Sequence, residues 1–201
     1  LREELKLTGI SFLTESDTEV ILRLYERYGS GMLCRLRGMF AFAIWDESKR
    51  ELFLARDPYG IKPLYYSDNG NVFRTASQVK ALIAGKNIET SPDPAGHTGF
   101  FLFGSIPEPY TLYKNIRALP AGHFLRVRSS GEHILECYFN IKHKLQIASK
   151  TFNPINIQGA IEESLEHHFV SDVPVGMFLS SGVDSASLVA LASERYSNDL
   201  Q

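Results

Sequence analysis

The stretch that most constrains the fold of this chain lies in its last quarter, at residues 172–188. It reads Asp-Val-Pro-Val-Gly-Met-Phe-Leu-Ser-Ser-Gly-Val-Asp-Ser-Ala-Ser-Leu, so an apolar run of strand length gives way to an Ala/Leu/Val-rich helical pattern. The pattern predicts a buried strand, a tight loop and a helix. Such a loop directs backbone N–H groups and the positive end of a helix dipole toward an anion. Gly182 removes a side chain that would keep the anion away, so a phosphate group is the expected ligand.

The composition excludes several classes of protein. The chain has 201 residues and a formal net charge of -2, which allows one large domain or two small ones and disfavours a nucleic-acid partner or an anionic membrane surface. No apolar stretch reaches the roughly 20 residues that span a bilayer, and the N-terminus lacks a signal-peptide pattern. We therefore expect a soluble, cytoplasmic protein without a membrane partner. Cys34 and Cys137 stand alone, which disfavours a disulfide framework or a zinc site.

The first 139 residues are predicted to be rich in strands. Ser16 and Glu19 have the spacing of a capping box, and they open a helical pattern that closes near Gly29. Residues 39–46 and 51–55 are β-prone and are predicted to pair as a hairpin.

A second hairpin is predicted directly after the first. Asn69-Gly70 indicates a tight two-residue turn between residues 64–67 and 72–75. Ser77 is expected to cap a short helix. The remaining expectations in this part are a polar connector at residues 85–94 and further β structure at 111–116, 122–128 and 133–139.

The apolar pattern weakens after residue 139, which predicts a domain boundary. Residues 140–153 are interpreted as a linker, and Pro154 is expected to open a helix because its missing N–H costs little in a first turn. Helix, buried strand, loop and helix form the start of a parallel α/β sheet. The predicted organisation is therefore a domain at 1–139, a linker at 140–153 and the start of a second domain at 154–201.

The loop in the second domain differs from better-known phosphate loops. It has no Gly-x-x-x-x-Gly-Lys-Ser/Thr pattern, which disfavours a Walker-type NTPase, and no Gly-x-Ser-x-Gly pattern, which disfavours a hydrolase nucleophile elbow. An acid beside a bound phosphate is repulsive unless a cation lies between them, so Asp184 implies magnesium if a nucleotide binds. The alternative is an ordinary strand-to-helix connection in which Ser or Asp is the N-cap.

Several motifs in one order resemble a known family. Residues 175–185 resemble the pyrophosphate loop of the N-type ATP pyrophosphatases, and the preceding Asp172-Val173-Pro174 is typical of the asparagine synthetase branch. Segments upstream are similar to the glutaminase domain of the same family, namely 16–19, 37–42, 56–57, 60–66 and 119–122. The resemblance to the glutamine-hydrolysing asparagine synthetases covers essentially the whole chain.

The resemblance implies a fold and an activity. The first domain would be a class II amidotransferase with an α+β, Ntn-hydrolase-like α/β/β/α sandwich, and the second would begin an α/β parallel-sheet ATP pyrophosphatase. Ammonia from glutamine would be transferred to an adenylated carboxylate, most simply aspartate to give asparagine, with release of AMP, pyrophosphate and glutamate. The implied ligands are glutamine, aspartate, ATP and magnesium, and the resemblance leaves a homodimer open.

The resemblance also assigns residues. Asp17 matches the acid that holds the α-ammonium of glutamine, a charge-assisted contact of roughly 1.5–3 kcal/mol, although a first-turn dipole partner is the alternative role. Asp184 matches the magnesium-linked acid. We assign the Arg56-Asp57 and Lys62-Pro63 elements to architecture. The residues that match the ATP and pyrophosphate site are Leu179, Ser180, Ser181, Gly182, Val183, Asp184 and Ser185.

The chain departs from the family pattern at three points. The nucleophilic cysteine of the family is N-terminal, and Cys34 inside Leu-Cys-Arg-Leu cannot replace it because its own α-amino group is not free to act as base. We therefore assign no catalytic residue and expect a fragment at both ends that is itself inactive. Ser181 stands where glycine is usual, and the later synthetase strands are not in the sequence. Two alternatives stay open: a sibling amidotransferase with another carboxylate acceptor, and an inactive binding or regulatory module.

Overall fold

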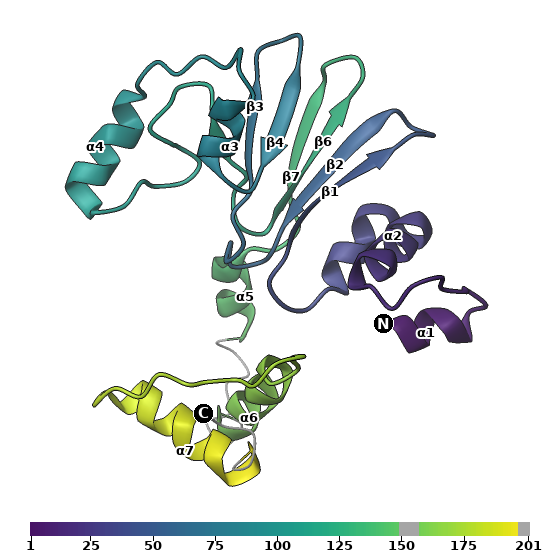
Figure 1. The fold of residues 1–201 in the computed structure, drawn as a ribbon, viewed down its shortest axis with the longest axis vertical. Helices are drawn as coiled ribbons and strands as arrows, with labels where there is room; N and C mark the ends of the chain where they lie inside the picture. The colour runs from purple at the N-terminus through teal and green to yellow at the C-terminus, as the bar shows by residue number, and fades with distance from the viewer. Residues whose placement is uncertain (149–156, 197–201) are drawn as a thin grey trace. The chain divides into compact units, whose positions relative to one another are not determined.

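The computed structural model describes residues 1–148 and 157–196, which form two compact units at Leu1–His143 and Lys144–Gln201 (Figure 1). A helix, α5 (Ile141–Ala148), lies in the range predicted to be a linker. The helix predicted to open at Pro154 begins, in the described residues, at Ile157, and Pro154 itself lies outside them. No helix in the described part of the chain is long and apolar enough to cross a membrane.

The larger sheet of the first unit has four antiparallel strands in the order β1-β2-β6-β7. The hairpin predicted at its edge is confirmed, with Ala41 opposite Arg56 and Asp46 opposite Glu51. The strands predicted near residues 122–128 and 133–139 are also confirmed. The strands are β1 (Ala41–Asp46), β2 (Glu51–Arg56), β6 (His123–Arg128) and β7 (His133–Cys137).

The smaller sheet is formed by β3 (Tyr65–Asp68), β4 (Phe73–Ala76) and β5 (Arg117–Ala118), in the order β4-β3-β5. The β3–β4 hairpin was predicted, but its two-residue turn was wrong, because Asp68 pairs with Phe73 and four residues lie between them. The Asn69 side chain accepts hydrogen bonds from the backbone N–H groups of Asn71 and Val72 at 3.1 and 2.9 Å, which favours the longer turn.

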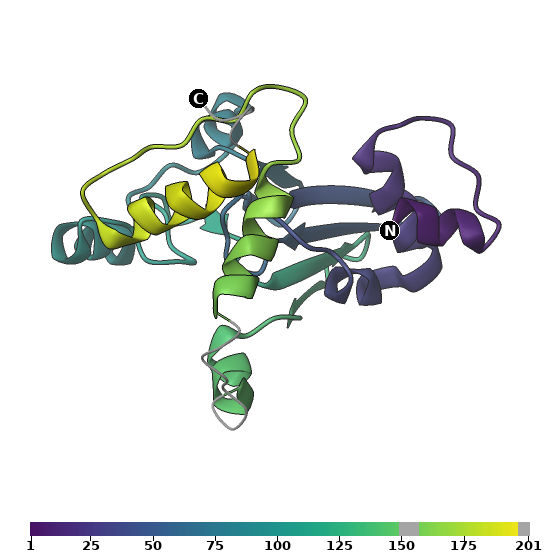
Figure 2. The ribbon, with the colours of Figure 1, turned by 90° about the horizontal axis from the view of Figure 1, so that it is seen from below.

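The two sheets and the helices form four layers, as the fold class predicted. One face of the larger sheet packs against α2 (Asp17–Tyr28) and the 3-10 helix η1 (Gly29–Cys34), and Phe53 is at the centre of this cluster. The opposite face, with Leu54 and Leu125, packs against the smaller sheet. Successive side chains along a strand point to opposite faces of the sheet, so each strand supplies apolar residues alternately to the two faces. The short helix α3 (Val79–Ala84) contacts β3 and β4, and α1 (Arg2–Leu7) lies beside α2 in both views (Figures 1 and 2).

A helix that the sequence pattern did not predict, α4 (Pro94–Phe103), follows the connector. Asp93 caps it by accepting a hydrogen bond from the Ala95 N–H at 2.9 Å, and Pro94 occupies its first turn. Gly96 has a packing role, because a Cβ there would lie 1.9 Å from the Thr111 carbonyl oxygen. The glycines and the unbroken apolar run Phe-Phe-Leu-Phe hid the helical period.

Two smaller predictions in the first unit were also wrong. The N-cap of α3 is Gln78 rather than Ser77, and it makes no side-chain capping bond. Residues 111–116 form turns in place of the predicted strand, with a single bridge between Pro92 and Tyr113. The cause is the Thr111 hydroxyl, which donates within the segment to carbonyl oxygens and so competes with ladder pairing.

The second unit contains two described helices, α6 (Ile157–His168) and α7 (Val183–Tyr196). They pack through Leu165 and Ala192, and Phe169 stacks on Tyr196 with ring centroids 4.2 Å apart. The buried strand predicted before the loop was wrong for the described structure: Val175 forms a single bridge, residues 176–180 belong to no strand, and Phe178 is fully exposed. A lone strand has no partner for its backbone groups, and no neighbouring strand is found among the described residues of this unit.

Candidate functional site

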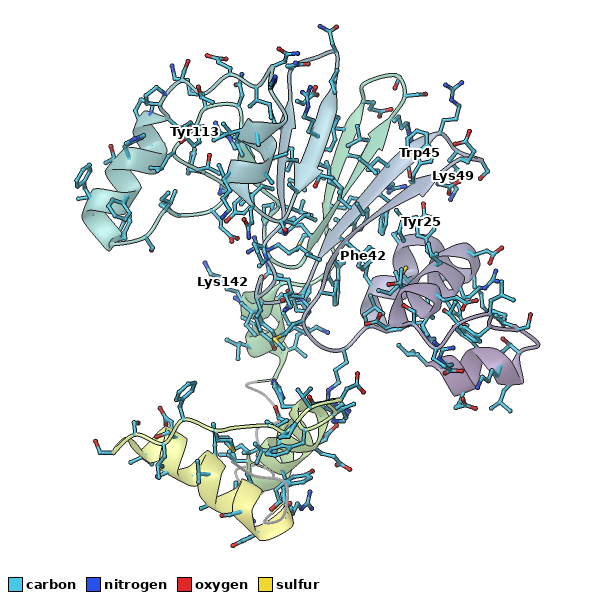
Figure 3. All side chains as sticks on the ribbon, in the orientation of Figure 1. Tyr25, Phe42, Trp45, Lys49, Tyr113 and Lys142 are labelled. Carbon is cyan, nitrogen blue, oxygen red and sulfur yellow. The ribbon has the colours of Figure 1, made fainter. Side chains whose placement is uncertain are left out.

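A hollow of about 390 Å³ lies at the N-terminus of α2. Asp17 and Thr18 of the first helical turn form one wall, and residues 39–44 around β1 form another. Lys62, Pro63 and Ser77 complete it from the connections around the smaller sheet. The hollow therefore combines an apolar floor with one acidic and one basic side chain, and Phe42, on its β1 wall, is labelled in Figure 3.

The local structure leaves the Asp17 carboxylate free. The Ser16 hydroxyl accepts the capping hydrogen bond from the Thr18 N–H at 3.2 Å. The expected capping box was wrong in its second half, because Glu19 accepts from the backbone N–H groups of Leu13 and Thr14 instead. These bonds hold the pKa of Glu19 below its usual value. In the described part of the chain Asp17 has no ion-pair partner, so it can bind an ammonium group.

A buried carboxylate, Asp57, fixes the part of the hollow that carries Lys62 and Pro63. Its Oδ1 accepts the N–H groups of Tyr59 and Ile61, both at 3.1 Å, and its Oδ2 accepts the Lys62 N–H at 2.9 Å. Its side chain is fully buried. The carboxylate therefore clamps the turn that presents Lys62 and Pro63 to the hollow, as the architectural interpretation of these elements predicts.

Arg56 holds the same turn by further hydrogen bonds. Its guanidinium donates to the carbonyl oxygens of Lys62, Gly60 and Leu119 at 2.8, 2.7 and 2.6 Å. It also pairs with the Glu108 carboxylate at 2.7 Å. The Tyr138 hydroxyl donates to the Arg56 carbonyl oxygen at 2.7 Å, and burial together with the nearby Asp57 charge raises the pKa of Tyr138. The wall is thus rigid, which favours a fixed substrate position.

The position of Lys62 is the feature that the sequence interpretation underestimated. The Lys62-Pro63 element was assigned to architecture, and the exposed Lys62 side chain also lines the same hollow as Asp17. A carboxylate and an ammonium that line one hollow can bind the two charged groups of a free α-amino acid. The sequence signal that could have placed Lys62 on the hollow is the spacing Asp57-x-x-x-x-Lys62. This spacing is informative only once the hydrogen bonds of Asp57 to the turn are known.

The predicted phosphate loop is closed by its own serines. The Ser180 and Ser185 hydroxyls lie 2.7 Å apart, and Ser180 Oγ accepts the Gly182 N–H at 3.2 Å. Ser185 Oγ also donates to the carbonyl oxygens of Ser180 and Gly182. The structure therefore brings Ser180, Gly182 and Ser185 together at the start of α7.

The other predicted residues of this loop point outward. Leu179, Ser181, Val183 and Asp184 are exposed, and Asp184 lies in the first turn of α7. A Cβ added to Gly182 would lie 3.3 Å from Ser180 Oγ, so glycine keeps this side of the loop open. Residues 1–148 and 157–196 contain no group of three or more potential metal ligands. Asp184 alone suits magnesium, which keeps several waters and takes further ligands from phosphates.

Neither cysteine belongs to a predicted site. Cys34, at the end of η1, and Cys137, in β7, are both exposed free thiols, and neither lines the hollow at Asp17. The two loops of interest, at Asp17 and at Ser180–Ser185, belong to different units. No cysteine is found among the described residues that line the hollow.

Comparison with known proteins identifies the class of this chain. Residues 1–139 match the family model described as the glutamine amidotransferase domain, and residues 156–201 match the model described as asparagine synthase. The chain belongs to the glutamine amidotransferase family. Its resemblance to the glutamine-hydrolysing asparagine synthetases, predicted from the motifs, is confirmed by these two matches together.

Individual proteins resemble this chain to different degrees. The asparagine synthetase [glutamine-hydrolyzing] 1 of Bacillus subtilis is 38% identical over 194 residues, covering 96% of this chain and 30% of the relative. The amidase chry2 of Gibberella zeae is 29% identical over 211 residues, covering 96% of this chain and 28% of the relative. A solved glutamine phosphoribosylpyrophosphate amidotransferase of B. subtilis covers 100% of this chain and 42% of its own, with a TM-score of 0.47 and 20% identity. The chain thus spans less than a third of the length of these two sequence relatives.

Proposed function

We propose that this chain is part of a glutamine-dependent amide ligase of the asparagine synthetase type. Such an enzyme hydrolyses glutamine to glutamate and ammonia, and the ammonia attacks a carboxylate activated by ATP, with release of AMP and pyrophosphate. The observation that carries the proposal is the order of the two matches, a glutamine amidotransferase domain at 1–139 followed by an asparagine synthase segment at 156–201. The proposed site of action is the cytoplasm.

The hollow at the start of α2 is the proposed glutamine site. The free Asp17 carboxylate would bind the α-ammonium of glutamine, and Lys62, which lines the same hollow, would bind its α-carboxylate. The apolar residues of β1 would contact the methylene groups of the side chain. Because both charged groups of the substrate are held, the side-chain amide has a defined direction, which is what attack by a nucleophile requires.

The loop at the start of α7 is the proposed nucleotide site, formed by Leu179, Ser180, Ser181, Gly182, Val183, Asp184 and Ser185. Backbone N–H groups at the helix N-terminus and the outward Ser181 hydroxyl would bind the pyrophosphate of ATP. Asp184 would hold magnesium through one carboxylate oxygen. The metal supplies charge neutralisation at the phosphates.

A matched pair of variants tests the nucleotide site in the full-length native protein. Asp184→Asn is expected to abolish aspartate-dependent exchange of pyrophosphate into ATP while glutamine hydrolysis continues. Glu166→Gln, which changes an exposed acid of the same unit in α6, outside the loop and its preceding motif, is expected to leave exchange unchanged. Normal exchange in Asp184→Asn would contradict the magnesium role.

A second pair tests the glutamine site. Asp17→Asn is expected to raise the KM for glutamine at least about tenfold, because a charge-assisted bond of about 1.5–3 kcal/mol is lost. Synthesis from added ammonium should continue, since that reaction does not use the hollow. Glu15→Gln, at the exposed loop just before the helix, is the control and should leave the KM unaltered. Equal loss of both activities in Asp17→Asn would count against the site.

A different carboxylate acceptor is the second candidate. It is favoured by the amidase relative, which matches nearly the whole chain without being named an asparagine synthetase. Pyrophosphate exchange with a panel of carboxylic acids distinguishes the candidates, because exchange with aspartate alone would exclude the second one.

A further inference from the structure

A second hollow, of about 460 Å³, lies at the opposite end of α2 from Asp17. The helix separates the two ends by roughly 16 Å at 1.5 Å per residue. Its wall is formed by the last residues of α2, the start of η1, the β1–β2 turn and the adjoining ends of β2 and β6. Figure 3 shows two of its residues, Tyr25 on α2 and Lys49 on the turn, whose ammonium lies 5.0 Å from the tyrosine ring centroid.

Glu51 is the unusual residue of this hollow. Its side chain is only 7% exposed, yet its sole described ion pair is with Arg128 Nε at 3.5 Å, longer than a charge-assisted hydrogen bond. No other polar partner of the Glu51 carboxylate is found within the described residues. A nearly buried carboxylate without short hydrogen bonds is costly, and a ligand with an ammonium group would relieve that cost.

The cations of the hollow are already paired with other acids. Lys49 bonds to Asp46 at 2.8 Å. Arg128 donates to Glu132 at 2.6 Å. Among these described acids, Glu51 is therefore the one without a short ion pair.

The same hollow has a donor without an acceptor. Arg126 pairs with Glu136 through its terminal nitrogen, but its Nε–H is buried with no hydrogen-bond partner in the described structure. Arg126 and Arg128 lie on the same face of β6 because they are two residues apart, and this face also presents Phe124 to the core. The hollow thus combines a carboxylate whose sole described ion pair is long with a donor that lacks an acceptor, and Tyr28 and Ser30 also line it.

We propose that this hollow binds a free α-amino acid, with its ammonium group against Glu51 and its carboxylate against Arg126. The volume falls within the range of about 300–1,000 Å³ that small-molecule pockets have. Simple anions do not fit the site, because Glu51 would repel them. Simple amines leave the Arg126 donor unsatisfied. The site is separate from the proposed glutamine site and does not depend on it.

Calorimetric titration of the Asp17→Asn protein tests the proposal, since that background weakens binding at the first hollow. The probes are asparagine, aspartate, glutamine and glutamate, each with its N-acetyl and its α-amide analogue. At least one free amino acid is expected to bind with one-to-one stoichiometry, and both of its blocked analogues at least about tenfold more weakly. Absence of binding by all four, or equal binding of the blocked analogues, would overturn the proposal.

Two further variants place the binding in this hollow. Glu51→Gln keeps the side-chain volume and is expected to weaken binding at least about tenfold. Ser30→Phe keeps every charge, fills the rim and is expected to block binding, which covers the case in which Glu51→Gln does not fold. Glu47→Gln, at an exposed position of the same turn, is the control. Unchanged affinity in folded Glu51→Gln or in Ser30→Phe would contradict the assignment.

Discussion

The Asp57 clamp gives the sharpest prediction about stability. In Asp57→Asn the amide oxygen can keep the bonds from Tyr59 and Ile61, which both go to Oδ1. The amide nitrogen then replaces Oδ2 and meets the Lys62 N–H, which now lies 2.9 Å from that position. Two donors face each other in a fully buried place, and the two remaining bonds lose their charge assistance.

The magnitude follows from those changes. A hydrogen bond to a charged acceptor contributes about 1.5–3 kcal/mol, and a buried unsatisfied donor costs about 1–3 kcal/mol. We therefore expect the free energy of unfolding to fall by about 3 kcal/mol. Asp17→Asn, which changes an exposed acid without an ion-pair partner in the described chain, should cost less than about 1 kcal/mol.

Urea unfolding followed by tryptophan fluorescence measures this difference. Trp45 is the single tryptophan of the chain and lies on β1, so it reports on the first unit alone. A loss of less than about 1 kcal/mol in Asp57→Asn would refute the reasoning, because it would mean that the clamp bonds contribute little beyond an ordinary surface contact.

Two further changes test the packing and the electrostatics of the first unit. Gly96→Ala should lower the free energy of unfolding by about 3 kcal/mol in the same assay, because the new Cβ would overlap the Thr111 carbonyl oxygen. Gly31→Ala is the control, and it should change the free energy of unfolding by less than about 1 kcal/mol because the space around Gly31 is open. Equal effects of the two substitutions would contradict the packing argument. Hydrogen bonds from Lys49 and Ser48 hold the pKa of Asp46 below its usual value of 3.8. The stabilisation is present above the pKa that Asp46 has in the unfolded state, and it is lost as the pH falls through the pKa of the folded state. The free energy of unfolding of the wild type should therefore decline below about pH 4, and that of Asp46→Asn should decline less. Parallel pH profiles of the two proteins would show that Asp46 does not contribute.

Local patterns were sufficient where a segment finds its partner nearby. The β1–β2 hairpin follows from alternating β-prone residues on either side of a polar turn, and α2 follows from its Ser16 cap and apolar face. Helix α4 was missed because Gly96 serves a contact with a distant segment, which no local pattern reveals. The prediction of a strand before Ser180 was wrong because a parallel strand is stable only beside neighbouring strands.

The sites show the same division. Asp17 and the Ser180–Ser185 loop could be proposed as site residues from motifs, since each proposal depends on a short run of residues. The position of Lys62 on the Asp17 hollow depends on hydrogen bonds to Asp57 and could not be read from spacing alone. The hollow around Glu51 combines three separate segments of the chain, 25–30, 49–53 and 126–128, and sequence reasoning gave no sign of it.

Nitrogen transfer tests the central claim most directly. The full-length native protein would be supplied with glutamine carrying an isotopically labelled amide nitrogen, together with aspartate, ATP and magnesium. The account predicts labelled nitrogen in the side-chain amide of asparagine, with AMP and pyrophosphate formed in equal amounts. Labelled ammonium without labelled asparagine, or ADP and phosphate in place of AMP and pyrophosphate, would contradict it.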